Sequence, residues 1–175
     1  MTIASLPEGR LRRAVPADAA ALALLGGATF LHAFAVDHPG EGIVAHVTTL
    51  HSADWYAAAL AAPETAVWIV ETPLAAPIAY AVLMPGSLGA PGDLELKRLY
   101  VLGPWQGSGW GERLLATVEA EARARGAQRL LLCVYSGNPG AQRFYARHGF
   151  ADTGGQVDFM VGEAAFVDLV FAKPL

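Results

Sequence analysis

The segment from Leu94 to Tyr135 constrains the fold most, because it reads as a strand, a glycine-rich turn, a helix and a second strand in direct succession. "LELKRLYVL" (Leu94–Leu102) reads as a strand, and "QGSGWGERLL" (Gln106–Leu115) leads into a helix that ends near Gly126. "RLLLCVY" (Arg129–Tyr135) is a continuous apolar run, which is typical of a strand buried on both faces. The segment therefore predicts two strands of a sheet joined by a crossover helix.

The rest of the chain adds further strands and helices to this unit. We predict helices over Pro16–Phe34, from Ser52 onward and over Pro139–His148, and strands over Gly9–Val15, Thr65–Glu71, Pro77–Met84 and around the closing sequences "QVDFMV" and "FVDLVFA". Residues 37–51 fit no single assignment. Strands in runs, together with crossover helices, predict an α/β or α+β fold with one central sheet. The length of 175 residues predicts a single domain over residues 1–175.

The composition argues against several classes of function. The formal net charge of −4 disfavours a nucleic-acid-binding protein, which usually carries a basic face. The single cysteine, Cys133, excludes an internal disulfide and a multi-cysteine metal site. No continuous apolar stretch approaches the length of a membrane span, and the first residues lack the order of a signal peptide. We therefore expect a soluble cytoplasmic protein with no membrane partner.

The glycine turn is a candidate anion site, because three glycines stand at alternate positions just before the helix. The first N–H groups of a helix lack internal partners, and the helix dipole adds about half a positive charge there. Gly107, Gly109 and Gly111 would let a diphosphate approach this backbone, although a tight connector without a ligand would also use glycine. A nucleotide P-loop needs a Lys-Ser/Thr pair that is absent, and the dinucleotide fingerprint needs glycine where Glu112 stands.

A second motif follows at a fixed distance, and the two together resemble one family. The spacing Gln106-x-x-Gly109-x-Gly111 resembles the acetyl-CoA pyrophosphate loop of the GNAT N-acetyltransferases, and "NPGAQRFYARHGF" (Asn138–Phe150) resembles that family's next motif. The resemblance covers a cofactor-binding core of residues 94–150. It implies a mixed central sheet of six to seven strands flanked by about four helices, and acetyl-CoA as co-substrate with no metal. The closing strands and "ATFLHAF" are similar, more loosely, to the PaiA-type polyamine acetyltransferases.

The resemblance also implies which residues contact the cofactor. In the family the strand equivalent to Leu94–Leu102 splays from the next strand, so that its main chain pairs with pantetheine, and an N–H near Val101 is a candidate oxyanion donor. Asn138 has two compatible interpretations, a cofactor contact and a helix N-cap. The side chain of Trp110 either shields the diphosphate or packs on the sheet. The implied cofactor-binding residues are Leu99, Tyr100, Val101, Gln106, Gly107, Ser108, Gly109, Trp110, Gly111, Glu112 and Asn138.

Two residues are candidates for the proton transfers that amine acetylation requires. Only the neutral amine attacks a thioester, so a base must remove a proton. Glu95 resembles the general base of several family members, although it would equally pair with Lys97 or Arg98. Tyr145 matches the family's tyrosine that protonates the departing thiolate, or it packs through its ring. We expect Cys133 to be a core residue, because direct attack by the amine needs no acyl-enzyme.

The sequence leaves the acceptor amine open. Phe30, Phe34, Asp37, Glu41 and Trp55 are candidates for the acceptor site by position, and Asp37 and Glu41 would suit a polyamine, although ordinary helix surface explains them as well. We predict an acetyl-CoA-dependent N-acetyltransferase that acts on a small-molecule amine by direct attack. The alternatives are a peptide or protein amine as acceptor, or an acyl-CoA-binding sensor without turnover. The resemblance to the GNAT family also implies a homodimer.

Overall fold

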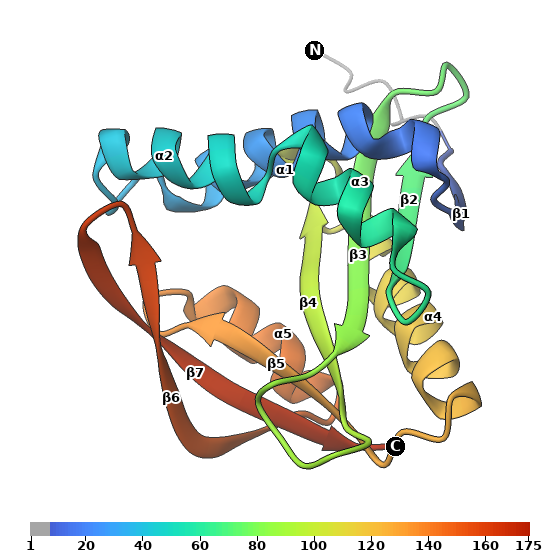
Figure 1. Cartoon of the computed structure of the whole chain (residues 1–175), viewed down its shortest axis with the longest axis vertical. Helices are drawn as coiled ribbons and strands as arrows, with labels where there is room; N and C mark the ends of the chain where they lie inside the picture. Colours follow the sequence, from blue (N-terminus) through green and yellow to red (C-terminus); the bar gives the residue numbers. More distant parts are fainter. Residues whose placement is uncertain (1–7) are drawn as a thin grey trace.

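The computed structural model describes residues 8–175 as one mixed sheet with helices on both faces (Figure 1). Within these residues, seven strands are hydrogen-bonded in the order β1-β2-β3-β4-β5-β7-β6, and only the β4–β5 pair is parallel. The elements are β1 (Arg10–Arg13), α1 (Ala19–Phe34), α2 (Gly40–Leu50), α3 (Ala53–Ala61), β2 (Ala66–Glu71), β3 (Pro77–Pro85), β4 (Leu94–Val101), α4 (Trp110–Ala124), β5 (Arg129–Tyr135), α5 (Pro139–Arg147), β6 (Ala151–Val161) and β7 (Ala164–Pro174).

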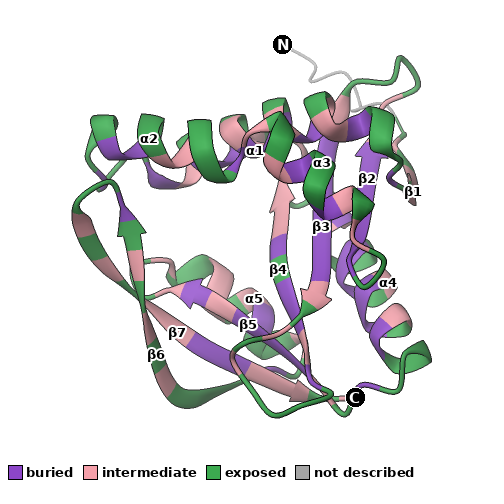
Figure 2. Cartoon of the chain, viewed as in Figure 1, coloured by how far each residue is buried: buried purple, intermediate pink, exposed green. Residues whose placement is uncertain are grey.

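Apolar clusters hold the helices against the two faces of the sheet, and a third cluster joins α1 and α2 to the end of β6. On one face α4 and α5 pack on the sheet through residues such as Leu114, Val118 and Tyr145. On the other face Leu22 of α1 and Tyr56 of α3 pack against alternate residues of β2 and β3. Because both faces are covered, β2 and β3 are buried almost throughout, whereas much of β6 is exposed (Figure 2). The central strands are therefore a rigid base for the residues at their ends.

The parallel strands β4 and β5 separate soon after they begin. Their register contains only the pairs Leu94–Leu130 and Glu95–Leu131, and Figure 1 shows the two strands diverging toward α1. A β-bulge in β4 leaves Lys97 without a partner on β3, because Val82 faces Arg98 and Leu83 faces Leu96. The predicted splay is thus confirmed, and beyond Glu95 no strand from the described part of the chain pairs with β4 on the β5 side.

The predicted fold class is confirmed, and the structure assigns the segment that the sequence left open. Residues 37–51 contain α2, and both closing strands are longer than predicted, because they pair with each other as a hairpin. The helix predicted from Pro16 begins as a 3-10 turn, Pro16–Asp18, before α1. Contrary to expectation, Pro16–Phe34 is long and apolar enough to cross a membrane by length and composition alone. Its apolar character has a local cause, since residues such as Leu22, Leu25 and Phe30 pack into the protein core.

Candidate active site

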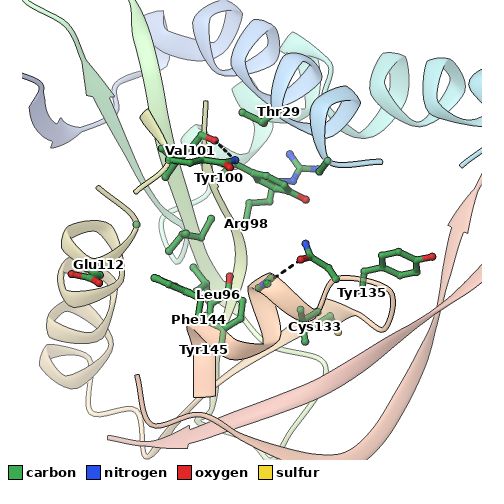
Figure 3. A pocket seen from close by; sticks show the side chains of 18 of the residues that line it. Thr29, Leu96, Arg98, Tyr100, Val101, Glu112, Cys133, Tyr135, Phe144 and Tyr145 are labelled. Atoms are coloured by element: carbon green, nitrogen blue, oxygen red, sulfur yellow. Dashed lines mark hydrogen bonds between the residues drawn. The ribbon is translucent and has the colours of Figure 1, made fainter. Parts of the chain in front are cut away.

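A cavity of about 620 Å³ opens where β4 and β5 diverge. Side chains from α1, β4, β5, the turn before α4, α4 and α5 converge on it (Figure 3). It is lined by Thr29, Ala33, Phe34, Leu96, Lys97, Arg98, Leu99, Tyr100, Val101, Trp105, Gln106, Gly107, Gly109, Gly111, Glu112, Cys133, Val134, Tyr135, Asn138, Gly140, Ala141, Phe144, Tyr145 and Arg147. The two sequence motifs therefore meet at one cavity.

The glycine turn combines a left-handed backbone with open space. Gly107 and Gly109 have φ values of 77° and 86°, which disfavour any residue with a Cβ atom. A Cβ at either position would meet no protein atom within 4 Å, so these two glycines border space and not packed side chains. Gly109 is the N-cap of α4 and supplies no side chain to the helix start. The turn therefore needs glycine for its own geometry and also leaves the first N–H groups of α4 without a side-chain cap.

The remaining residues of the turn are placed in different ways. Gln106 lines the cavity, and its Nε2 donates to the carbonyl oxygen of Val101 at 3.1 Å. The hydroxyl of Ser108 donates to the carbonyl of Trp105 and does not line the cavity. Trp110 is 6% exposed and packs in the core, so only its main chain is available at the helix start. The sheet-packing interpretation of Trp110 is the one observed.

Glu112 lies in the first turn of α4 and lines the cavity. Its carboxylate is 3.9 Å from Nε2 of His148, which follows the C-terminal end of α5 in the second motif. A carboxylate at a helix N-terminus is favoured by the dipole but competes there with a bound anion. Glu112 therefore marks the solvent-facing border of the turn, where its side chain is largely exposed.

The unpaired edge of β4 forms one wall of the cavity. Leu99, Tyr100 and Val101 line it, and each is paired with β3 on the opposite side of the strand. Burial raises the pKa of Tyr100 to about 12, so its phenol stays protonated at neutral pH. Main-chain groups on the β5 side of this segment lack a strand partner and suit an extended polar chain such as pantetheine.

Helix α5 brings Asn138 and Tyr145 to the same cavity. Oδ1 of Asn138 accepts the N–H of Ala141 at 3.0 Å, which confirms the N-cap interpretation, and the residue also lines the cavity. Tyr145 is 9% exposed and belongs to the core cluster on the α4 side. Burial raises the pKa of Tyr145 well above its usual value, with a smaller contribution from Tyr100. Tyr145 is therefore a neutral hydroxyl donor at the wall of the cavity.

Glu95 is buried and paired. Its Oε1 accepts Nζ of Lys97 at 3.1 Å, and the side chain is not among those that line the cavity. The ion-pair interpretation from the sequence is thus observed, and Lys97 itself reaches the cavity.

A second carboxylate, Asp168 on β7, was not anticipated from the sequence. It faces Tyr135 of β5 in the strand register, and one of its oxygens, Oδ1, is buried with no hydrogen-bond partner among residues 8–175. Burial raises its pKa to about 6, while nearby Lys97 and His38 act in the opposite direction.

The acceptor candidates are scattered. Phe34 and Phe30 are buried in the same core cluster, and of the two only Phe34 also lines the cavity. Asp37 lies beside the cavity, where its carboxylate accepts the hydroxyl of Tyr135 at 3.0 Å and contacts Nδ1 of His38 at 2.6 Å. Glu41 is exposed and does not line the cavity. Of the two carboxylates predicted to bind a polyamine, Asp37 is therefore already hydrogen-bonded to Tyr135 and His38, and Glu41 does not line this cavity.

Trp55 lies outside the cavity, whereas Arg98, Tyr135 and Cys133 line it. Trp55 does not line the cavity but stacks on the guanidinium of Arg98, 3.6 Å from the ring centroid. Arg98 and Tyr135 do line it, and only spatial proximity, not a motif, reveals them. Cys133 is half-buried at the cavity wall, which corrects the expectation of a core position. Burial raises the pKa of its thiol to about 12, so it is no thiolate nucleophile at neutral pH.

Comparison with known proteins identifies a family and a fold. Residues 28–150 match the model of the acetyltransferase (GNAT) family. An uncharacterized N-acetyltransferase of Mycobacterium tuberculosis is 37% identical over 98 residues, or 56% of this chain and 60% of that protein. The match therefore spans less than two thirds of the relative's length.

Solved structures share the whole architecture. The PaiA N-acetyltransferase from Thermoplasma acidophilum in complex with coenzyme A aligns with a TM-score of 0.80 at 17% identity, covering 96% of this chain and 99% of that one. A ribosomal-protein alanine N-acetyltransferase from Escherichia coli aligns with a TM-score of 0.70 at 16% identity, covering 95% and 94%. At these identities the likeness shows the fold.

Proposed function

This chain belongs to the acetyltransferase (GNAT) family, and from that premise we propose that it is an acetyl-CoA-dependent N-acetyltransferase acting on a primary amine of a small molecule. The observation that supports the proposal most is the meeting of three features at one cavity: the uncapped start of α4, the unpaired edge of β4 and the hydroxyl-bearing Tyr145. They suit, in order, a diphosphate, an amide-containing arm and a leaving thiolate.

In the proposed cofactor site the α4 start holds the diphosphate through main-chain N–H groups. The open space above Gly107 and Gly109 supports this placement, because a side chain there would occupy the position of the ligand. Gln106 and Asn138 border the same space. The main chain of Leu99 to Val101 then binds the pantetheine arm, so the thioester lies near the bulge in β4. Acetyl-CoA supplies the acyl group, and the chain positions it.

The proposed reaction is direct attack of the neutral amine on the thioester carbon. The C–N bond forms, the C–S bond breaks, the amine loses a proton to a base and the thiolate gains one from an acid. Tyr145 is the proposed acid, because its buried phenol is protonated at neutral pH and lies at the cavity.

Glu95 is the proposed base, acting through water because its side chain does not line the cavity. Asp168 is the alternative base, which would also act through water because its side chain does not line the cavity either; its pKa of about 6 makes it a carboxylate at neutral pH that still has useful basicity.

The acceptor of the proposed reaction is a small amine. The looser resemblance to polyamine acetyltransferases makes a polyamine one acceptor to assay, but Asp37 and Glu41 do not supply free carboxylates at the cavity. The homodimer that the resemblance implies stays a prediction, which sedimentation velocity of the purified chain tests.

The test is release of CoA thiol from acetyl-CoA in the presence of polyamines, amino acids, aminoglycosides and short peptides, with the acetylated product identified by mass spectrometry. We expect release above the amine-free rate with at least one small amine. Acetyl-CoA binding without turnover on any amine would contradict the enzyme and favour the sensor. Turnover restricted to peptides would contradict the small-molecule acceptor.

A further inference from the structure

Arg98 carries a buried charge with no counter-ion in the described part of the chain. The residue is 8% exposed, and no carboxylate within residues 8–175 lies at ion-pair distance from its guanidinium. Among residues 8–175 the fully buried acidic residues are each paired: Asp18 with Arg12 at 2.7 Å, Asp93 with Arg129 at 2.6 Å, Glu95 with Lys97 at 3.1 Å and Glu119 with Lys173 at 2.6 Å. Asp168, which is half-buried, keeps one carboxylate oxygen without a partner among the same residues. Arg98 thus differs from the fully buried carboxylates of this part of the chain, because it has no ion-pair partner.

The guanidinium is nevertheless held in place. Its Nη2 donates to the carbonyl of Leu50 at the end of α2, and its central carbon, Cζ, lies 3.6 Å from the ring centroid of Trp55 and 5.1 Å from that of Tyr56. Its Nη1 is buried and has no hydrogen-bond partner among residues 8–175. Nη2 therefore anchors the guanidinium to α2, while Nη1 is held without an acceptor in this part of the chain.

Arg98 lies at the end of the cavity nearest α1 (Figure 3). Arg98 lines the cavity and lies on the side of α1, with Thr29 nearby, whereas Glu112 marks the turn and α4 (Figure 3). Arg98 packs against α3 through Trp55, on the sheet face opposite to the α4 core. The proposed diphosphate position at Gly109 is therefore not the partner of Arg98. The neighbouring cation Lys97 is already paired with Glu95.

The guanidinium donor of Arg98 indicates which chemical group its missing partner carries. A buried donor that stays unsatisfied destabilises the protein, and more so when it is charged. A guanidinium N–H forms its stronger hydrogen bonds with anionic oxygens such as those of a carboxylate. We propose that Arg98 binds a carboxylate of the acceptor through Nη1, so that the substrate class is small amines that also carry a carboxylate, such as amino acids. This inference rests on the proposed function, because it names the acceptor of that reaction.

Binding of non-reactive product analogues tests the inference without turnover. The CoA complex of the wild-type chain is titrated calorimetrically with N-acetylated amino acids of increasing chain length, each beside its carboxamide and the mono-N-acetylated diamine of equal length. We expect at least one carboxylate to bind about tenfold more tightly than its carboxamide, with the diamine derivative weakest. Equal binding of carboxylate and carboxamide at every length, or binding of neither, would overturn the proposal.

Two variants separate recognition from a structural role. In Arg98→Gln the preference for carboxylate over carboxamide should vanish, and in Arg98→Lys part of it should remain, while the affinity for CoA alone stays unchanged. A preference that survives in Arg98→Gln, or an equal loss for carboxylate and carboxamide, refutes recognition by Arg98. The wild-type comparison needs no variant, so a misfolded Arg98→Gln leaves the test intact.

Failure of the proposed function gives a different pattern. If carboxylates bind with the stated preference but no amine is acetylated, the acetyl-transfer proposal fails and the carboxylate site stands. If amines are acetylated at rates that do not depend on whether the amine carries a carboxylate, the acetyl-transfer proposal stands and the carboxylate site at Arg98 fails.

Discussion

Tyr145 shows how burial suits one residue to one proton transfer. The residue lines the cavity, and burial keeps its phenol protonated well beyond neutral pH. A protonated phenol can donate to a thiolate at the moment the C–S bond breaks, and this need arises only in the transition state.

We predict that Tyr145→Phe lowers kcat by about 10²-fold or more, the range for loss of a general acid, and leaves the affinity for acetyl-CoA nearly unchanged. Removing only the hydroxyl keeps the ring that packs with Phe144 and Phe150. Steady-state thiol release and a CoA titration give the two numbers. Equal losses in turnover and affinity would show that the tyrosine merely builds the site.

The two candidates for the general base, Asp168 and Glu95, lead to opposite predictions for the pH dependence of kcat/KM. If Asp168 is the base, kcat/KM rises with pH through an apparent pKa of about 6, because the base must be deprotonated. Asp168→Asn then removes this rise, and Glu95→Gln keeps it. If Glu95 is the base, Glu95→Gln causes the larger loss and Asp168→Asn leaves the profile in place. A rise that persists in both variants contradicts both assignments.

The sequence pointed to Tyr145 and Gly109 as candidate site residues but not to Arg98 or Asp168, for a physical reason. The first two stand in local patterns whose spacing is set by one turn and one helix. The guanidinium of Arg98 is positioned by Leu50 and Trp55, which are distant from it in the sequence. The position of Asp168 beside Tyr135 depends on the pairing of β7 with β5. Burial and missing partners are properties of the fold, so residue spacing alone does not encode them.

At the scale of elements, α4 offers a test in which its two ends serve as variant and control. Gly109 begins the helix with φ 86°, and Gly126 follows its end with φ 75°; a Cβ would meet nothing within 4 Å at either place. Alanine at either glycine should destabilise the chain by about 1–2 kcal/mol, because both backbones are left-handed.

Only Gly109→Ala should also weaken CoA binding, by about tenfold or more, since its methyl group projects toward the proposed diphosphate. Calorimetric titration of CoA into both variants, with melting temperatures as the measure of strain, makes the comparison. Equal CoA affinities in the two variants would remove the diphosphate from the start of α4.

The elements themselves were largely predictable, and the exceptions have causes in tertiary structure. The buried strand β5 and the glycine turn carry strong local signals, and both were placed correctly. Residues 37–51 carry no clear period, yet they form α2 by packing against α1 and β6. The length of β6 and β7 follows from their pairing with each other, which no single strand encodes.

At the scale of the whole molecule, a buried histidine couples stability to pH. Burial, reinforced by Arg98, lowers the pKa of His51 to about 2, whereas an unfolded histidine titrates near 6.5. The folded state therefore resists protonation, and its advantage is present above pH 6.5 and lost as the pH falls below it.

We predict that the free energy of unfolding falls by up to about 2 kcal/mol between pH 6.5 and 5, at 1.36 kcal/mol per pH unit. His51→Gln should flatten this decline, while His32→Gln, at an exposed position on α1, should not. Urea unfolding at a series of pH values measures both. An identical decline in the two variants would show that other groups set the acid limit.

The central claim is that the edge of β4 and the start of α4 bind acetyl-CoA through their main chains. Amide hydrogen exchange with and without acetyl-CoA tests it directly, because it reports on the N–H groups themselves. The account predicts slower exchange in two segments, residues 97–101 and 109–113, and unchanged exchange in β6. Protection that is absent from both segments, or that falls mainly elsewhere in the sheet, would contradict it.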